Sequence, residues 1–297
     1  MKKNLKKIKT RKIYVLIPVY NDWLSLSKLL RAIDKMIKKN NINILIINDC
    51  STEKNKNSKH QFKNIKSVKV INLKRNVGHD RAIAVGLNIL YKKKLFDYVI
   101  TMDSDGEDNP KDIKSFIEKI NEDKNVIIVA KRIKRSENLV FSILYFLHLV
   151  ILFIFVGKWI NFGGYNCLSK LAVKNLLKEK TIWGNYPATI AISKSKIKFL
   201  NTHRSKRYYG PSQMTYFKLF LHSLSILAVF KKKIFYKVAV LISVNFLIIL
   251  LYNNLILYIP AIVLLIFILL ILIMSIRENI SWRHQVTKNI FSVSKLF

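Results

Sequence analysis

The stretch "YVITMDSDGEDNP", residues 98–110, changes character twice. Its apolar start, residues 98–102, is typical of a buried strand, and Pro110 can open a helix because the first helical turn needs no N–H at that position. Between them lies a loop that gathers four carboxylates, Asp103, Asp105, Glu107 and Asp108. A strand that leads through a polar loop into a helix is the repeating unit of an α/β sheet.

The same unit recurs along the first half of the chain. Continuous apolar runs, as in a buried parallel sheet, predict strands at 13–19, 42–47, 68–73, 98–102 and 126–130. Apolar residues with helical spacing lie between them. Asp22, Asp49 and the 103–108 loop each follow a strand directly. Because open α/β sheets bind ligands at the carboxyl ends of their strands, we expect these carboxylates to converge on one crevice.

The acidic loop stands out because the chain is strongly basic, with 52 Lys and Arg against 17 Asp and Glu and a net charge of +35. In an extended segment Asp103 and Asp105 point to the same side. Two carboxylates on one side suit Mg²⁺ or Mn²⁺, which typically bind through one or two carboxylates and substrate phosphates. A solvated acidic turn is the alternative. The position of the pair at the end of a buried strand favours the metal site.

The positive charge has two interpretations: a general abundance of Lys, Ile and Asn, as AT-rich coding would give, or attraction to a polyanionic partner, either nucleic acid or anionic membrane lipids. Lysines are scattered along the chain and are not gathered with aromatic residues on one face, so nucleic acid is not the expected partner. Two cysteines, Cys50 and Cys167, form no disulfide framework, and the apolar run 13–20 is too short for a signal peptide. We therefore expect the soluble part to lie in the cytoplasm.

Two apolar segments near the C-terminus predict membrane anchoring. Residues 234–252 and 255–276 are each long enough to cross a bilayer, and Lys237 lies near the start of the first, where its side chain can reach the interface. Lys231–Lys233 precede the pair and Arg277 follows it. By the positive-inside rule, the two segments form a hairpin in the cytoplasmic membrane with both ends in the cytoplasm.

A third apolar segment, residues 139–156, has basic residues on both sides. We expect it to lie in the membrane interface, and a crossing is the alternative. The predicted organisation is thus a catalytic domain at 1–230 with interfacial segments 139–156 and 213–231, a transmembrane hairpin at 231–276, and a basic cytoplasmic tail at 277–297. Whether the chain forms a homo-oligomer is left open.

Four motifs carry a resemblance to a known family: "IPVYND" from 17, "ILIINDCST" from 44, "NVGHDRAIAVGL" from 76 and "MDSDGEDNP" from 102. In this order and spacing the chain resembles the family 2 glycosyltransferases of the GT-A fold, and within them the polyprenyl-phosphate sugar transferases. The resemblance implies a mostly parallel GT-A sheet and a Mg²⁺ or Mn²⁺ cofactor. It also implies a UDP- or GDP-sugar donor and a polyprenyl phosphate acceptor.

The resemblance also assigns roles to individual residues. It places the donor nucleotide at Pro18, Tyr20, Asp22 and Asp49, with Asp49 near the base. It places the metal at Asp103, Asp105 and Glu107. The stretch "HRSKRYYGPSQM", 203–214, is similar to the family's R-x-x-R-x-x-G-x-S segment, so phosphate contacts fall to Arg132, Arg204, Arg207 and Ser212. Asp105 and Arg207 are the candidates for catalysis itself.

Several positions depart from the family pattern. Asp22 stands where Glu is usual, and Asn48 and Cys50 replace an Asp and a Gly, which leaves the nucleotide preference open. Gly164 stands where many relatives carry an Asp, so no clear general base is present unless Glu107 or Asp108 serves. A sugar hydroxyl normally needs such a base, whereas a phosphate monoester is already anionic near neutral pH. The pattern therefore favours a phosphate acceptor.

Three histidines, His79, His148 and His203, have no Cys or His at ligand spacing, and we expect structural roles for them. Two further alternatives stay open. One is a glycosyltransferase whose acceptor is a lipid-linked or surface-glycan saccharide. The other is a non-enzymatic basic membrane scaffold.

Overall fold

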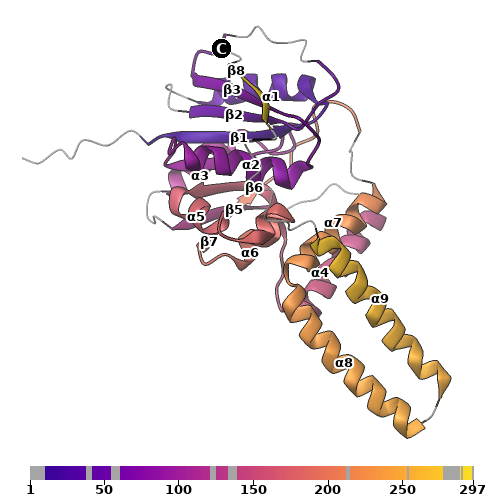
Figure 1. Cartoon of the computed structure of the whole chain (residues 1–297). Helices are drawn as coiled ribbons and strands as arrows, with labels where there is room; N and C mark the ends of the chain where they lie inside the picture. Colours follow the sequence, from indigo (N-terminus) through magenta and orange to yellow (C-terminus); the bar gives the residue numbers. More distant parts are fainter. Residues whose placement is uncertain are drawn as a thin grey trace, which may run out of the picture.

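The computed structural model describes residues 11–37, 42–54, 61–120, 125–132, 139–211, 215–252, 254–276, 288 and 290–295. They form a sheet domain from which a group of apolar helices extends (Figure 1). The sheet has eight strands in the order β7-β5-β6-β4-β1-β2-β3-β8. Their bounds are β1 (Ile13–Val19), β2 (Ile42–Asn48), β3 (Ile65–Leu73), β4 (Tyr98–Thr101), β5 (Val126–Arg132), β6 (Phe162–Ser169), β7 (Lys196–Thr202) and β8 (Ile290–Lys295).

The central strands β4, β1, β2 and β3 run parallel, so their carboxyl ends meet at one edge of the sheet. All five predicted strands are present, with β3 beginning three residues earlier than expected. The prediction of an α/β fold with a mostly parallel sheet is confirmed. The sequence analysis missed β6, β7 and β8, of which β6 and β8 pair antiparallel with their neighbours.

Helices cover both faces of the sheet. Helix α1 (Trp23–Met36) packs on one face, where Leu29 and Ile33 contact the side of β1 that carries Val15 and Ile17. Helix α2 (His79–Lys92) packs on the other face with Leu16. The remaining elements of this domain are α3 (Asp112–Lys119), α5 (Lys170–Leu176), the 3₁₀ helix η2 (Lys180–Trp183) and α6 (Tyr186–Ile192). The two layers hold the carboxyl ends of the central strands in place.

Strand β8 corrects the predicted domain plan. Residues 277–297 were expected to form a basic tail, but Ile290–Lys295 pairs antiparallel with β3. The side chain of Asn72 on β3 donates a hydrogen bond from its Nδ2 to Ser292 Oγ at 2.8 Å. Figure 1 shows β8 beside β3 at the edge of the sheet. Part of the predicted tail therefore belongs to the sheet domain.

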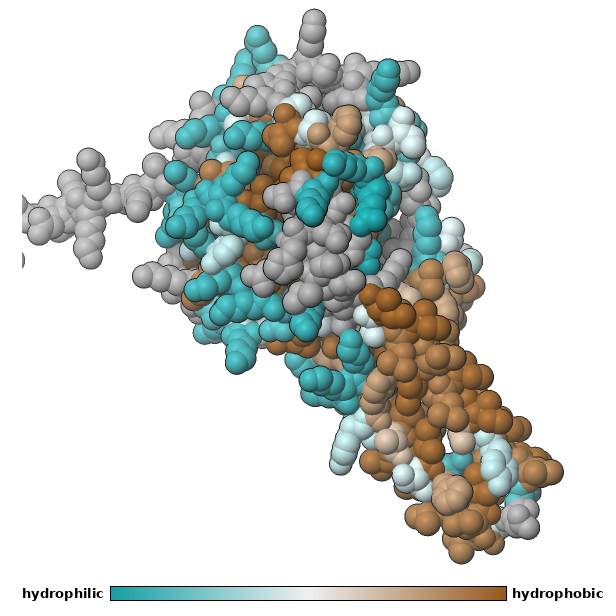
Figure 2. All heavy atoms as spheres, in the orientation of Figure 1, coloured by the Kyte–Doolittle hydropathy of each residue, from teal (hydrophilic) through white to brown (hydrophobic). Residues whose placement is uncertain are grey.

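Besides the cores on the two faces of the sheet, the apolar helices form a hydrophobic core of their own. They are α4 (Leu139–Val156), α7 (Tyr216–Val229), α8 (Lys231–Tyr252), the 3₁₀ helix η3 (Leu255–Leu257) and α9 (Tyr258–Ser275). Leu152, Ile226, Ile234 and Ile271 are buried where these helices meet. Two of the helices, at 231–252 and 255–275, are long and apolar enough to cross a membrane. Their surface is almost continuously hydrophobic in Figure 2, in contrast to the sheet domain.

Helix α4 spans the predicted segment from end to end. Its inner side contacts α7 and α8, while Leu147, Phe153 and Ile154 are exposed. Lys237 on α8 donates a hydrogen bond from its Nζ to the carbonyl of Ile154 at 2.6 Å. The helix is thus attached to the base of the α8–α9 pair, and its outer side is apolar.

Gly86 makes the contact between α2 and β1 possible. A Cβ at this position would lie 2.3 Å from Leu16 Cδ1, and Leu16 is fully buried. We expect Gly86→Ala to lower the free energy of unfolding by about 1–3 kcal/mol, because the core cannot take the extra atom without shifting. Thermal unfolding of the purified protein in detergent would measure the change. Gly163→Ala is the matched control, since a Cβ there meets no atom within 4 Å. Equal stability of the two variants would contradict the expected overpacking.

Candidate functional site

The acidic loop is folded on itself after β4. The backbone N–H of Asp103 donates to Asp108 Oδ2 at 3.0 Å, and the N–H of Glu107 donates to Asp105 Oδ1 at 2.9 Å. Asp108 is 3% exposed. Asp108 therefore shapes the loop, whereas the carboxylates of Asp103, Asp105 and Glu107 are partly buried against side chains from other segments.

A second segment, residues 203–210, lies directly over this loop. The N–H of Ser205 donates to the carbonyl of Glu107 at 2.8 Å, and the N–H of Tyr208 donates to the carbonyl of Asp105 at 2.9 Å. Gly106 has a φ of +86°, and a Cβ there would lie 2.4 Å from the Tyr208 ring. A glycine is needed for both reasons: its backbone takes the left-handed conformation, and it lets the ring approach.

The arginines of this segment pair with the carboxylates. Arg207 donates from Nη1 to Asp105 Oδ2 at 2.9 Å and from Nη2 to Asp22 Oδ2 at 2.6 Å. Arg204 donates from Nε to Glu107 Oε2 at 2.8 Å. The structure thus brings together residues that follow β1, β4 and β7. In the structure these arginines bind carboxylate oxygens, and a guanidinium can bind phosphate oxygens in the same two-pronged way.

Asp105 is buried beside another carboxylate. Burial and the nearby charge of Asp103 raise the pKa of Asp105 to about 6, even though Arg207 acts to lower it. Such a carboxylate binds a proton readily, and by the same electrostatics a metal cation. Asp103 and Asp105 therefore fit a divalent cation whose remaining ligands come from phosphates.

The metal set of Asp103, Asp105 and Glu107 stays a prediction. Within the part of the chain that the structure describes, no group of three or more His, Cys, Asp or Glu side chains is arranged to hold a metal. The carboxylate of Glu107 is paired with Arg204, and its charge also acts on Asp105. Asp103 and Asp105 are left as the candidate pair.

His79 is a site residue that the sequence analysis missed. Its Nε2 lies 2.8 Å from Asp103 Oδ1 and its Nδ1 lies 3.3 Å from Asp80 Oδ1. Burial acts to lower the pKa of His79, but the two carboxylates raise it well above its ordinary value. The available signal was its place at the start of α2, after the loop that follows β3, because that position lies at the same edge of the sheet as the acidic loop.

Gly164 lies beside this histidine. A Cβ at Gly164 would lie 3.4 Å from His79 Cε1 and 3.8 Å from Asp103 Oδ1. The space that a longer side chain at 164 would take is therefore next to the imidazole and the candidate metal carboxylate. The missing side chain leaves room for His79 to orient Asp103.

The residues predicted to line a nucleotide pocket differ in exposure and in hydrogen bonding. Tyr20 is exposed at the end of β1, whereas Pro18 is buried within the strand. Asp49 accepts hydrogen bonds from the N–H groups of Val77 at 2.7 Å and Gly78 at 2.9 Å, and it is 3% exposed. Asp49 therefore fixes the turn before α2, and little of its carboxylate faces open space.

The phosphate contacts of Ser212 and Arg132 stay predictions. Ser212 lies outside the described residues, and Arg132 ends β5 without a described side chain. Of the other two histidines, His148 is buried on α4 and His203 is exposed after β7. Neither is hydrogen-bonded to the acidic loop in the described part of the chain.

Comparison with known proteins gave one family model, described as glycosyl transferase family 2, which matches residues 14–198. Among curated proteins, no sequence match was found. The similar solved structures include glucosyl-3-phosphoglycerate synthase from Mycobacterium tuberculosis with Mn²⁺, uridine-diphosphate and phosphoglyceric acid. It is 14% identical and covers 75% of this chain and 78% of its own, with a TM-score of 0.48. The same enzyme with Mg²⁺ and uridine-diphosphate is 13% identical over 75% and 79%, with a TM-score of 0.49.

The contact between His79 and Asp103 leads to a prediction. His79→Asn should weaken Mn²⁺ binding by about 10–100-fold, because a shorter side chain cannot hold Asp103 in its ligating orientation. Titration of the purified protein with Mn²⁺, followed by electron paramagnetic resonance, would measure the affinity. His203→Asn changes an exposed histidine in the same way and should leave it unchanged. An unchanged affinity in His79→Asn would mean that the histidine does not position Asp103.

Proposed function

Because the chain belongs to glycosyl transferase family 2, we propose that it moves a sugar from a UDP- or GDP-sugar onto a polyprenyl phosphate at the cytoplasmic membrane. The family makes it a glycosyltransferase. The acceptor and the membrane are our proposal. The observation that carries the proposal is the position of the acidic site, which lies next to the apolar helices.

The connection runs through helices α2, α6 and α7. Burial lowers the pKa of His222 on α7, and the nearby carboxylate of Asp80 acts against that shift. Asp80 is the neighbour of His79, which contacts Asp103. Asn185 at the start of α6 also donates from Nδ2 to Ser225 Oγ on α7 at 3.0 Å. An acceptor that resides in the membrane would therefore reach the carboxylates without leaving the lipid.

The donor is proposed to bind at the acidic edge of the sheet. Asp103 and Asp105 would hold Mg²⁺ or Mn²⁺, which supplies Lewis-acid stabilisation of the departing diphosphate. Arg204 and Arg207 would exchange their carboxylate partners for phosphate oxygens, since a guanidinium binds either group in the same bidentate geometry. Asp22 and Tyr20 follow β1, which lies between β4 and β2, so they would lie beside a nucleotide that extends from the diphosphate toward β2.

A phosphate acceptor suits this site because its reaction needs no carboxylate as general base. An oxygen of the acceptor phosphate forms a bond to the anomeric carbon while the bond from that carbon to the diphosphate oxygen breaks. A phosphate monoester is already anionic near pH 7, so the step needs no general base. Of the alternative bases, Asp108 is buried and accepts from the backbone of Asp103, and Glu107 pairs with Arg204 until that arginine turns to the donor phosphate. This favours the lipid phosphate over a saccharide hydroxyl.

The membrane part of the proposal rests on α8, α9 and α4. Both α8 and α9 are long and apolar enough to span, and Lys231–Lys233 stand at the start of α8. The exposed apolar side of α4 suits the interface between lipid and water. Anionic lipids on the cytoplasmic face would attract the basic residues nearby.

The acceptor is tested by transfer from radiolabelled UDP- and GDP-sugars to polyprenyl phosphate or to a lipid-linked saccharide. We expect a labelled lipid phosphate from one donor, and loss of transfer in excess EDTA. Asp105→Asn should lower the rate at least about 100-fold, because one of two cation-binding carboxylates is lost. Glu118→Gln is the control, since this carboxylate is exposed on α3. Transfer to the saccharide alone, or full activity in EDTA, would contradict the proposal.

The topology is tested by labelling single cysteines in intact cells with an impermeant thiol reagent. The background replaces Cys50 with Ser, and Cys167 is buried. Asn254→Cys, between α8 and α9, should react from outside because the hairpin exposes this end. Lys158→Cys, after α4, should react only after permeabilisation. External labelling at 158 would show that α4 crosses the membrane.

A further inference from the structure

Helix α8 carries an amide side chain, Asn245, within its apolar length. Lys237 marks the interfacial end of this helix, because its Nζ donates to the carbonyl of Ile154 at the base of the α8–α9 pair. At about 1.5 Å of rise per residue, Asn245 lies about 12 Å further along the helix. The hydrocarbon core of a bilayer is about 30 Å thick. If α8 spans the membrane, Asn245 therefore lies near the middle of the core.

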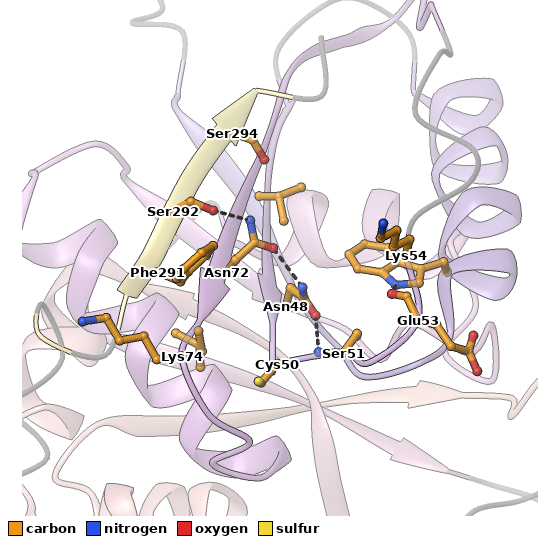
Figure 3. A pocket seen from close by; sticks show the side chains of 13 residues that line it. Asn48, Cys50, Ser51, Glu53, Lys54, Asn72, Lys74, Phe291, Ser292 and Ser294 are labelled. Atoms are coloured by element: carbon orange, nitrogen blue, oxygen red, sulfur yellow. Dashed lines mark hydrogen bonds between the residues drawn. The ribbon is translucent and has the colours of Figure 1, made fainter.

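The carbonyl oxygen of this amide lacks a partner. Asn245 Oδ1 is buried, and no donor among the described residues lies within hydrogen-bond distance of it. At the strand ends of the sheet domain, by contrast, two amides pair with each other: Asn48 donates from Nδ2 to Asn72 Oδ1 at 2.8 Å (Figure 3). In hydrocarbon no water can replace such a partner, so an unpaired amide is unfavourable. The amide therefore points to a hydrogen-bonding group that another molecule brings into the membrane.

The neighbours of Asn245 on the same side of α8 form a seam. Leu241, Asn245, Ile248 and Tyr252 follow one another at intervals of four, three and four residues, the spacing of the contact positions in a coiled coil. Leu241 is 45% exposed and Ile248 is 37% exposed, although Val238 nearby is buried among the apolar helices. Lipid chains can cover the apolar members of the seam, but they offer no hydrogen bond to the amide. A second helix with a polar group at the same depth can do both.

We propose that this helix is α8 of a second copy of the chain, and that the two Asn245 side chains hydrogen-bond to each other within the membrane. The inference rests on the proposed function, which places α8 across the bilayer. Two copies with the same topology are related by a two-fold axis along the membrane normal, so each residue of α8 meets its own counterpart at the same depth.

An amide is complementary to a copy of itself, because it carries both a donor and an acceptor. Nδ2 of Asn245 in one copy donates to Oδ1 of Asn245 in the other. A single Asn in such a seam also fixes the register of the two helices and the number that associate. The apolar neighbours Leu241 and Ile248 pack around the pair and keep it away from lipid.

The dimer is tested by Förster energy transfer between donor-labelled and acceptor-labelled full-length protein in liposomes, followed as the ratio of lipid to protein is raised. Asn245→Leu should raise the dissociation constant of the dimer about 3–20-fold, which is the usual contribution of a polar contact between membrane helices. Asn245→Gln keeps the amide and should keep most of the affinity. Ser243→Ala is the matched control, because this hydroxyl lies on another side of α8 and already donates to the carbonyl of Ala239 at 3.0 Å.

Oxidative cross-linking of single cysteines in membranes locates the contact independently, in the background that replaces Cys50 with Ser. Ile248→Cys should form a disulfide between two copies. Leu247→Cys should not, because this side chain, although 59% exposed, points away from the side that carries Asn245. Cross-linking at 247 and not at 248 would place the contact on another face of α8 and would overturn the proposal.

The remaining outcomes separate this proposal from the proposed function. A monomer in liposomes, or a dimer with an unchanged dissociation constant in Asn245→Leu, would overturn the amide pair. If Asn254→Cys still reacts with the impermeant reagent from outside, the proposed anchoring stands without the pair. If Asn254→Cys does not react, α8 does not cross the membrane, and the anchoring fails together with the inference that rests on it.

Discussion

The guanidinium of Arg207 lies between Asp22 and Asp105, two carboxylates that follow different strands. Parallel strands bring their carboxyl ends together, and with them any acidic side chains placed there. Because Asp22 and Asp105 are largely buried, their charges are poorly screened by water, and an unpaired buried charge costs several kcal/mol. The arginine compensates for both, and in doing so holds residues 203–210 against the acidic loop.

In this arrangement the arginines occupy carboxylates that a metal ion could bind in their place. In the structure Arg207 and Arg204 pair with carboxylates of the acidic edge, while burial and the nearby charge of Asp103 still raise the pKa of Asp105. A metal–diphosphate would bring both a cation for the carboxylates and anionic oxygens for the arginines. Gly106 allows the two segments to approach this closely, because any side chain there would strike Tyr208.

Much of the fold could be predicted from the sequence, and the limits have physical causes. The buried parallel strands are continuous apolar runs, and α4, α8 and α9 are long apolar segments, so local composition was sufficient. The strand β6, "FGGYNCLS", begins with glycines and polar residues, and β8, "IFSVSK", alternates within a basic region, so neither shows such a run. The pairing of Arg207 with Asp22 joins residues 185 positions apart, and the contact of His79 with Asp103 depends on how two loops meet. Residue types identified the acidic site, but not the partners within it.

The pairing of β8 with β3 also has a consequence for how the protein is made. During synthesis the apolar pair α8 and α9 leaves the ribosome before β8, so β3 remains the open edge of the sheet until the helices have been placed. An unpaired edge strand is a site for aggregation. If α8 enters the bilayer, α9 must return to the same side, or β8 cannot reach its partner. If α8 and α9 do cross the bilayer, the hydrogen bonds between β3 and β8 require an even number of crossings between α7 and β8, and the sheet would be completed only after both helices are inserted.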